Sequence, residues 1–170
     1  LYISIGHDEY WSGAQRKAVT DARDRGVHLM FLSGNEVYWK TRYESSLANG
    51  APHRTLVVYK DSQSETPLDP VEWTGTWRDD RSVNPEGGRP ENELTGTIFT
   101  VNAQRVDALK VPHEYGSMRQ WRHTPVALLG GVDDVYTTFK GLLGHEWDED
   151  LDNGHRPAGL ISLSETHVDN

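Results

Sequence analysis

The chain of 170 residues carries 17 Lys and Arg against 26 Asp and Glu, which gives a formal net charge of −9, and it has no cysteine. This length suits a single domain over residues 1–170 with its own core, and the composition excludes collagens, coiled coils and disulfide scaffolds. Nucleic acids and membrane surfaces are poor candidate partners, because an acidic chain is repelled by phosphate backbones and anionic lipids.

The first third of the chain predicts a strand–helix–strand unit. Residues 1–5 form an apolar run, Ser12 is a good N-cap, and Gly26 is a good helix stop before the apolar run 27–32. The helix between them, to about Arg25, is expected to bury a face with small apolar side chains: Ala14, Ala18, Val19 and Ala22. Such units pair their strands in parallel, so we predict an α/β fold with an open, largely parallel sheet and flanking helices.

The rest of the chain predicts further short strands and one long excursion. We expect strands at 55–59, 96–101, 125–129, 142–147 and 158–163. Residues 61–92 are rich in Pro, Gly and charged residues, and we predict a loop-rich excursion anchored by Trp73 and Trp77. The acidic run 146–152 is interrupted by Trp147 and Leu151, which predicts that it is anchored to the fold.

The sequence also gives expectations about membrane association, partners and cellular compartment. No apolar run approaches the roughly 20 residues of a membrane helix, and no signal peptide is visible, so we predict a soluble chain. Because the sequence opens directly on an apolar run, we expect a segment of a longer protein whose other domains are partners. A homo-oligomer is a further expectation left open, and the absence of cysteine is compatible with both the cytoplasm and export.

Several chemistries are excluded by missing residues. Without cysteine there is no thiol nucleophile and no thiolate metal site. The Gly-x-Ser-x-Gly elbow, the phosphate loop and the dinucleotide fingerprint are also missing.

Polar residues remain in the loops that should follow the first two strands, at 6–11 and 33–40. Loops at the carboxyl edge of adjacent parallel strands are where open α/β sheets bind ligands. The oxygen and imidazole groups in these loops and near residue 145 are His7, Asp8, Glu9, Tyr10, Asn35, Glu36, Tyr38, His145 and Glu146. Hard donors of this kind suit hard cations, and phenolate suits ferric iron. Tyr10 and Tyr38 are 28 positions apart, but this topology would bring them to neighbouring strands.

Four motifs carry a resemblance to a known family: residues 6–12 (GHDEYWS), 33–40 (SGNEVYWK), 90–96 (PENELTG) and 144–150 (GHEWDED). They resemble the C-terminal domain of the N,N-dimethylformamidase beta (large) subunit. The resemblance implies a glutamine-amidotransferase-like (flavodoxin-like) fold and hydrolysis of the C–N bond of a small amide. It also implies a mononuclear Fe³⁺ held by two tyrosines and one glutamate, which by motif match are Tyr10, Tyr38 and Glu146.

This chain departs from the family pattern at one position. The enzyme is thought to have a histidine two residues before the glutamate ligand, where this chain has Gly144, and the imidazole is His145 instead. In an extended strand His145 and Glu146 would point to opposite faces. The residues expected to orient ligands or move protons are His7, Glu9, Asn35 and His145.

Alternative interpretations of the same residues are open. The two Tyr-Trp pairs would close the sheet edge, His7 and Asp8 would cap the following helix, Asn35 would serve a turn, and Glu146 would be a solvated carboxylate. The alternative function is a non-catalytic ligand- or carbohydrate-binding or structural module of a larger protein, with sugars stacked on Trp73, Trp77 and Trp121.

Overall fold

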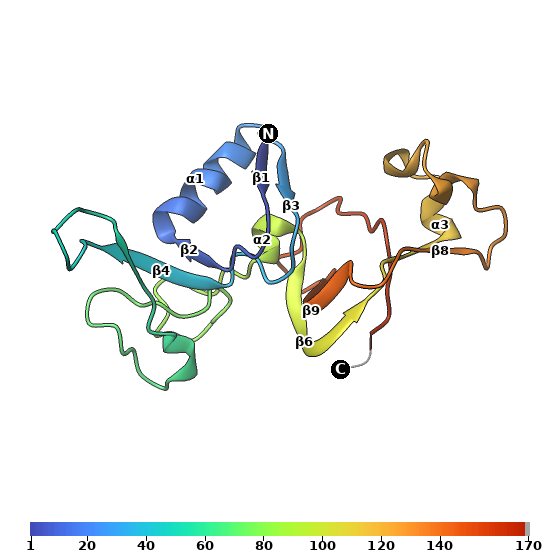
Figure 1. Ribbon diagram of the computed structural model, residues 1–170. Helices are drawn as coiled ribbons and strands as arrows, with labels where there is room; N and C mark the ends of the chain where they lie inside the picture. The colour runs from blue at the N-terminus through green and yellow to red at the C-terminus, as the bar shows by residue number, and fades with distance from the viewer. Residues whose placement is uncertain (169–170) are drawn as a thin grey trace. The chain divides into compact units, whose positions relative to one another are not determined.

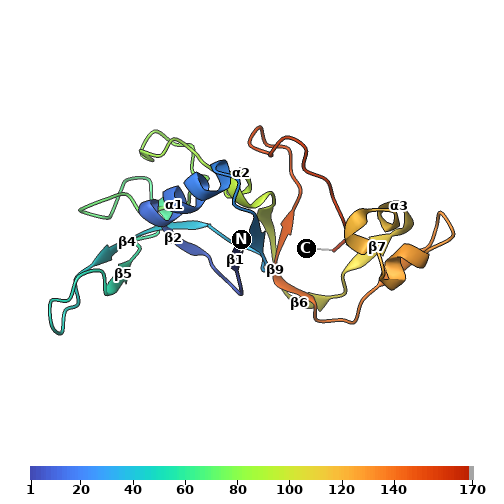
Figure 2. The same ribbon diagram turned by 90° about the horizontal axis from the view of Figure 1, so that it is seen from above.

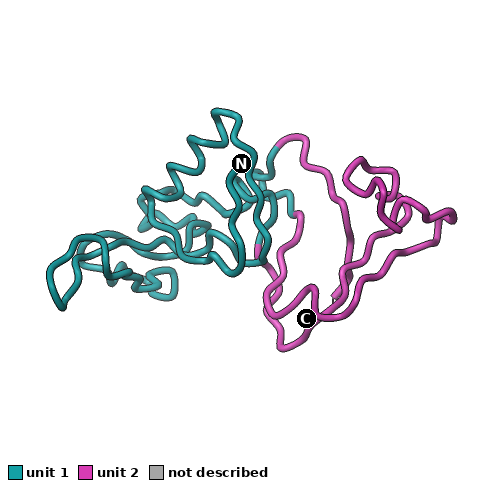
Figure 3. The backbone as a smooth tube through the Cα atoms, turned by 45° about the horizontal axis from the view of Figure 1, so that its top comes forward, with its two compact units in different colours: residues 1–98, 151–157 teal, residues 99–150, 158–170 magenta. Residues whose placement is uncertain are grey.

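The computed structural model describes every residue except 169 and 170. The chain divides into two compact units, shown in teal and magenta in Figure 3. Unit 1 contains Leu1–Ile98 and Leu151–Pro157, and unit 2 contains Phe99–Asp150 and the segment from Ala158 onward.

Unit 1 carries most of the regular structure. Its elements are β1 (Tyr2–Ser4), β2 (Tyr10–Ser12), α1 (Gly13–Asp24), β3 (Leu29–Phe31), β4 (Trp39–Glu44), β5 (Thr55–Val57), the 3₁₀ helix η1 (Asp61–Gln63) and α2 (Asn92–Thr95). Strands β1 and β3 pair in parallel, with Ile3 opposite Met30, and α1 lies between them in the chain (Figure 1). The predicted strand–helix–strand unit is therefore confirmed.

Helix α1 begins and ends where the sequence indicates. The Ser12 side chain accepts a hydrogen bond from the backbone N–H of Gln15 at 3.2 Å, and Gly26 follows the helix with a φ of +87°. The expected buried face is wrong at two of its four residues, because Ala14 and Ala18 are exposed. Val19 is buried as expected and Ala22 is half-buried, but the other fully buried residue of the helix is Arg16, which was not expected there. A charged residue occupies the inner face because its guanidinium finds partners there, which a pattern of apolar residues does not reveal.

The second sheet of unit 1 has the order β2-β4-β5. Strand β2 pairs in parallel with β4, and β4 pairs antiparallel with β5. The strand β2 lies inside the segment expected to be a loop, directly before α1. The view in Figure 2 shows β2, β4 and β5 as neighbouring strands.

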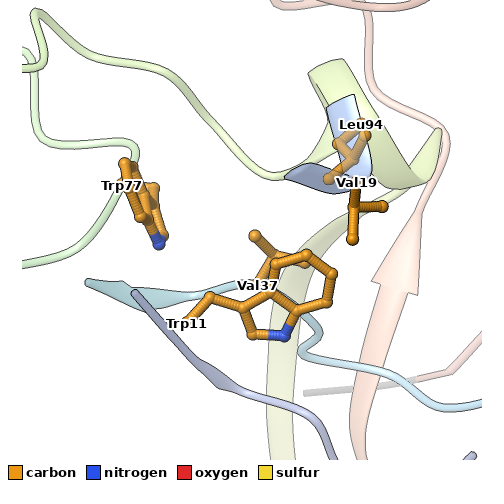
Figure 4. Close-up of a cluster of buried hydrophobic side chains, with 5 residues drawn as sticks. All are labelled: Trp11, Val19, Val37, Trp77 and Leu94. Carbon is orange, nitrogen blue, oxygen red and sulfur yellow. The ribbon is translucent and has the colours of Figure 1, made fainter. Parts of the chain in front are cut away.

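The core of unit 1 is small and aromatic. It consists of Trp11, Val19, Val37, Trp77 and Leu94, which Figure 4 shows gathered from segments far apart in the sequence. The rings of Tyr2 and Phe31 pack against Trp11 at centroid distances of 6.3 and 6.2 Å. The expected anchoring of the excursion is confirmed, because Trp73 and Trp77 are 5% and 1% exposed.

Residues 61–92 are ordered chiefly by buried charges. Arg42 on β4 donates to Asp69, Lys40 lies 2.8 Å from Glu72 and 2.7 Å from Glu86, and Arg78 pairs with Glu91. Burial lowers the pKa of Lys40, but its hydrogen bonds to Glu72 and Glu86 outweigh this effect and raise it. Buried charges persist when they are paired and hydrogen-bonded.

Unit 2 is built from short pieces. Its elements are β6 (Ile98–Asp107, of which only Ile98 belongs to unit 1), β7 (Lys110–Pro112), α3 (His113–Gly116), the 3₁₀ helices η2 (Arg119–Trp121) and η3 (Pro125–Leu128), β8 (Val135–Thr137) and β9 (Leu143–Glu149). Strand β6 pairs with β9, and β7 pairs antiparallel with β8. Trp147 is buried, as expected for an anchored acidic run, but Leu151 is 42% exposed.

The expected open, largely parallel sheet of the glutamine-amidotransferase or flavodoxin type is wrong. The described strands form four separate small sheets, and antiparallel pairs stand beside parallel ones. The apolar run 125–129 forms a 3₁₀ helix that begins with Pro125, and residues 158–163 form no strand. The apolar runs are too short to build a continuous sheet once loops and charge networks occupy the intervening residues. Within the described residues, no helix combines the length and apolar character that a membrane span requires.

Candidate functional site

The two predicted polar loops of unit 1 meet through their backbones. The N–H of Val37 donates to the carbonyl of Asp8, and the N–H groups of Tyr38 and Trp39 both donate to the carbonyl of Glu9, each at 2.9 Å. The parallel register of β2 and β4 places Tyr10 opposite Trp39. The expectation that these loops lie together is therefore confirmed.

Both candidate tyrosines are half-buried and each has a cation over its ring. The Lys60 ammonium lies 5.8 Å from the centroid of the Tyr10 ring and 4.8 Å from that of Trp39. The Arg78 guanidinium lies 4.9 Å from the Tyr38 ring, which contacts Trp39 edge-on at 5.1 Å. Trp39 therefore lies between the two tyrosines: its ring contacts Tyr38, and it is the register partner of Tyr10, with which it shares the Lys60 ammonium.

The segment between Gly34 and Tyr38 has an unusual backbone. Asn35 and Val37 both have left-handed φ angles, 52° and 59°, and both are buried, at 2% and 0% exposed. A β-branched residue rarely adopts this conformation, and such strain costs about 1–3 kcal/mol per residue. The left-handed φ of Asn35 is compatible with the alternative in which Asn35 serves a turn, because asparagine tolerates this conformation, whereas Val37 is strained and fixes the backbone directly before Tyr38.

Two carboxylates share a serine hydroxyl next to this segment. Ser4 Oγ lies 2.8 Å from Asp8 Oδ2 and 3.2 Å from Glu36 Oε2. Burial, and then the negative charges of Asp8 and Glu36, raise the pKa of Tyr2. Asp8 is thus engaged with Ser4, and Ser12 caps α1, so the alternative in which Asp8 and His7 cap that helix is wrong.

His7 and Glu9 form a pair within the first polar loop, residues 6–11. The His7 Nε2 atom lies 3.1 Å from Glu9 Oε2, and the side chains are 46% and 13% exposed. An imidazole oriented by a carboxylate is a common arrangement for moving a proton. The geometry is compatible with the predicted role of both residues.

The remaining predicted residues, His145 and Glu146, lie on β9 in unit 2. His145 is exposed and has a left-handed φ of 59°, whereas Glu146 is half-buried and precedes the buried Trp147. Strict alternation of side chains along the strand does not hold at His145, because its backbone is not extended. No group of three or more His, Asp or Glu residues in the described part of the chain is arranged to hold a metal ion.

Sequence reasoning missed three residues of this region: Ser4, Lys60 and Arg78. Ser4 is a polar residue inside an apolar strand, and this was a readable signal. Lys60 lies directly before the excursion and Arg78 lies within it, in a stretch where charged residues are so common that none stands out. Their relation to Tyr10 and Tyr38 depends on how the excursion folds back onto β4, through an antiparallel bridge between Trp39 and Thr76.

Comparison with known proteins now gives the family. The family model described as N,N-dimethylformamidase beta subunit-like, C-terminal, matches residues 1–170. The chain belongs to this family. The match spans both units and confirms the resemblance seen in the four motifs. A comparison with curated proteins gives no match. Since the family is described as the C-terminal part of a subunit-like protein, it agrees with the expectation that other domains are partners of this dimethylformamidase-like domain.

The structure does not favour the carbohydrate-binding alternative. Sugar stacking needs exposed aromatic faces, whereas Trp73 and Trp77 are buried in unit 1. Trp121 is half-buried, and its indole N–H donates to the carbonyl of Leu163 at 3.0 Å. All three tryptophans are engaged in the fold.

Proposed function

We propose that this dimethylformamidase-like domain hydrolyses the C–N bond of a small amide with the help of a bound iron ion. The observation that carries the proposal is the pairing of β2 with β4, which brings the chain segments of Tyr10 and Tyr38 side by side within a chain matched over its whole length by the family. The strained backbone at Val37 adds support, because strain of this kind is retained where function requires it.

The donor chemistry of Tyr10 and Tyr38 fits iron. Tyr10 and Tyr38 offer phenol oxygens from adjacent chain segments, and hard oxygen donors suit ferric iron. Bound there, the ion would polarise an amide carbonyl as a Lewis acid and lower the pKa of a coordinated water. Glu146, in unit 2, is a third ligand only by motif match, and its assignment stays a prediction, as does the role of His145.

The chain's own residues would orient the site and move the proton. In this proposal Glu9 orients the His7 imidazole, and His7 takes a proton from the water that attacks the amide carbonyl and passes it to the leaving nitrogen. The amide and water then give a carboxylate and a protonated amine. Asn35 is proposed to act beside Tyr38 as a fixed amide group, since its backbone and its burial leave the side chain little freedom.

The direct test is iron content combined with turnover. Purified wild-type protein is analysed for iron and assayed against a panel of small amides that includes N,N-dimethylformamide, with release of the amine as the readout. We expect stoichiometric iron and turnover that both fall sharply in Tyr10→Phe and Tyr38→Phe. Tyr43→Phe is the matched control, because Tyr43 lies on β4, the strand that directly follows Tyr38, but is 43% exposed. Wild-type protein that takes up no iron and hydrolyses no amide would refute the proposal.

A further inference from the structure

Lys60 differs from the buried cations of unit 1. Arg16, Lys40 and Arg42, which are 1%, 2% and 8% exposed, each pair with at least one carboxylate. The half-buried Lys60 ammonium instead lies over the rings of Tyr10 and Trp39. Within the described residues no carboxylate lies within ion-pair distance of it. In a chain with a net charge of −9, a half-buried cation without an acidic partner is a notable exception.

The backbone holds Lys60 in this position. Its φ angle is 54°, a left-handed conformation that costs a residue with a long side chain some strain. Directly after it, Asp61 accepts hydrogen bonds from the N–H groups of Leu68 and Thr74, each at 2.6 Å, and the Asp61 N–H donates to the carbonyl of Thr74. The backbone of Lys60 is therefore held by an anchored turn, and the ammonium at the end of its side chain lies over two rings.

The position of Lys60 relates it to the candidate site. Tyr10 and Trp39 are partners across β2 and β4, so their side chains lie on the same face of that sheet. Lys60 covers both rings on this face. The aromatic rings bind the Lys60 ammonium more weakly than a carboxylate would, and no acidic side chain among the described residues neutralises it. The ammonium beside the Tyr10 ring is therefore suited to binding an anion.

We infer that Lys60 forms a subsite for a carboxylate group, on the face of the β2–β4 pair that carries Tyr10 and Trp39. The inference rests on the proposed function, because amide hydrolysis converts a neutral amide and water into a carboxylate and a protonated amine. The ammonium would then bind the carboxylate product and stabilise the negative charge that develops on the carbonyl oxygen during attack. No proton transfer by Lys60 is required.

Acetate is the probe that tests the subsite without turnover. The full chain is titrated with sodium acetate at constant ionic strength, and binding is followed through the NMR signal of the Trp39 indole N–H, assigned with Trp39→Phe. Lys60→Met should weaken acetate binding about tenfold or more, whereas Lys60→Arg, which keeps the charge, should stay within about threefold of wild type. Lys17→Met, at an exposed lysine on α1, is the control and should bind acetate as wild type does.

The outcomes separate the subsite from the proposed function. Equal acetate affinity in wild type and Lys60→Met, or an equal loss in Lys60→Met and Lys60→Arg, would overturn the subsite, because the positive charge would then not be what binds. If Lys60→Met does not fold, the comparison of wild type with Lys60→Gln and Lys60→Arg decides in the same way. Charge-dependent acetate binding in a protein that hydrolyses no amide would refute the proposed function and leave the subsite standing.

Discussion

Replacement of Asp61 by asparagine should destabilise the excursion 61–92 strongly. Asp61 is 1% exposed, and its carboxylate accepts hydrogen bonds from the N–H groups of Leu68 at 2.6 Å, Asp69 at 3.2 Å and Thr74 at 2.6 Å. Both carboxylate oxygens accept hydrogen bonds: Oδ1 from the N–H groups of Leu68 and Asp69, and Oδ2 from that of Thr74. An asparagine amide has one oxygen and one NH₂ group, so in either orientation it turns a donor toward at least one buried N–H.

The magnitude follows from these bonds. A hydrogen bond to a charged group contributes about 1.5–3 kcal/mol, and a buried donor left without an acceptor costs about 1–3 kcal/mol. In the better orientation the amide oxygen serves Leu68 and Asp69, and the Thr74 N–H loses its acceptor. We therefore expect the free energy of unfolding of unit 1 to fall by about 2–4 kcal/mol in Asp61→Asn.

Two measurements check this prediction. Urea unfolding followed by tryptophan fluorescence reports on Trp73 and Trp77, and hydrogen exchange reports on the amides of Leu68 and Thr74 directly. Asp133→Asn, at an exposed position of unit 2, removes the same charge from the chain and should leave both readouts unchanged. A loss of less than about 0.5 kcal/mol in Asp61→Asn, with exchange at Thr74 as slow as in wild type, would refute the assignment of Asp61 as the organiser of the excursion.

Three further predictions concern stability. Hydrogen bonds from Arg81 lower the pKa of Asp79 to about 2 in the folded state, below its unfolded value. Asp79 should therefore add about 1–2 kcal/mol to the free energy of unfolding above about pH 4, and this contribution should be lost as the pH falls toward 2. In a plot of the urea midpoint against pH, Asp79→Asn should flatten this part of the curve. Arg42→Met should lower the free energy of unfolding measured with urea by about 3–5 kcal/mol, because it leaves Asp69 buried without its cation. The double variant Arg42→Met/Asp69→Leu should recover part of this loss. Gly26→Ala should lower the melting temperature measured by circular dichroism, at a cost of about 1 kcal/mol, because the φ of +87° strains any residue with a Cβ.

The local features that depend on short stretches of sequence were predictable. The limits of α1 follow from Ser12 and Gly26, and the parallel pairing of β1 with β3 follows from the strand–helix–strand order. The meeting of the two polar loops follows in turn from that pairing. Each of these depends on capping, glycine conformations and chain connectivity, which act over a few residues.

The long-range arrangement was not predictable in the same way. The prediction of an open parallel sheet was wrong for two reasons. An apolar run such as 125–129 does not distinguish a strand from a 3₁₀ helix. The sequence of a strand also does not show whether its partner runs parallel or antiparallel, as in the antiparallel pair of β4 and β5. The buried face of α1 was predicted incorrectly because the Arg16 guanidinium donates hydrogen bonds to the carbonyls of Arg89 and Pro90. These partners lie more than seventy residues further along the chain. Lys60 was missed for the same reason, since its position depends on the folded excursion.

The central claim is that Tyr10 and Tyr38 are iron ligands, and the visible absorption spectrum of the iron-loaded protein tests it most directly. Tyrosinate bound to Fe³⁺ gives a charge-transfer band in the visible range. The account predicts such a band in wild type and in Tyr43→Phe, with a marked decrease in Tyr10→Phe and in Tyr38→Phe. A colourless protein after loading with ferric iron, or a band that is unchanged in both tyrosine variants, would contradict it.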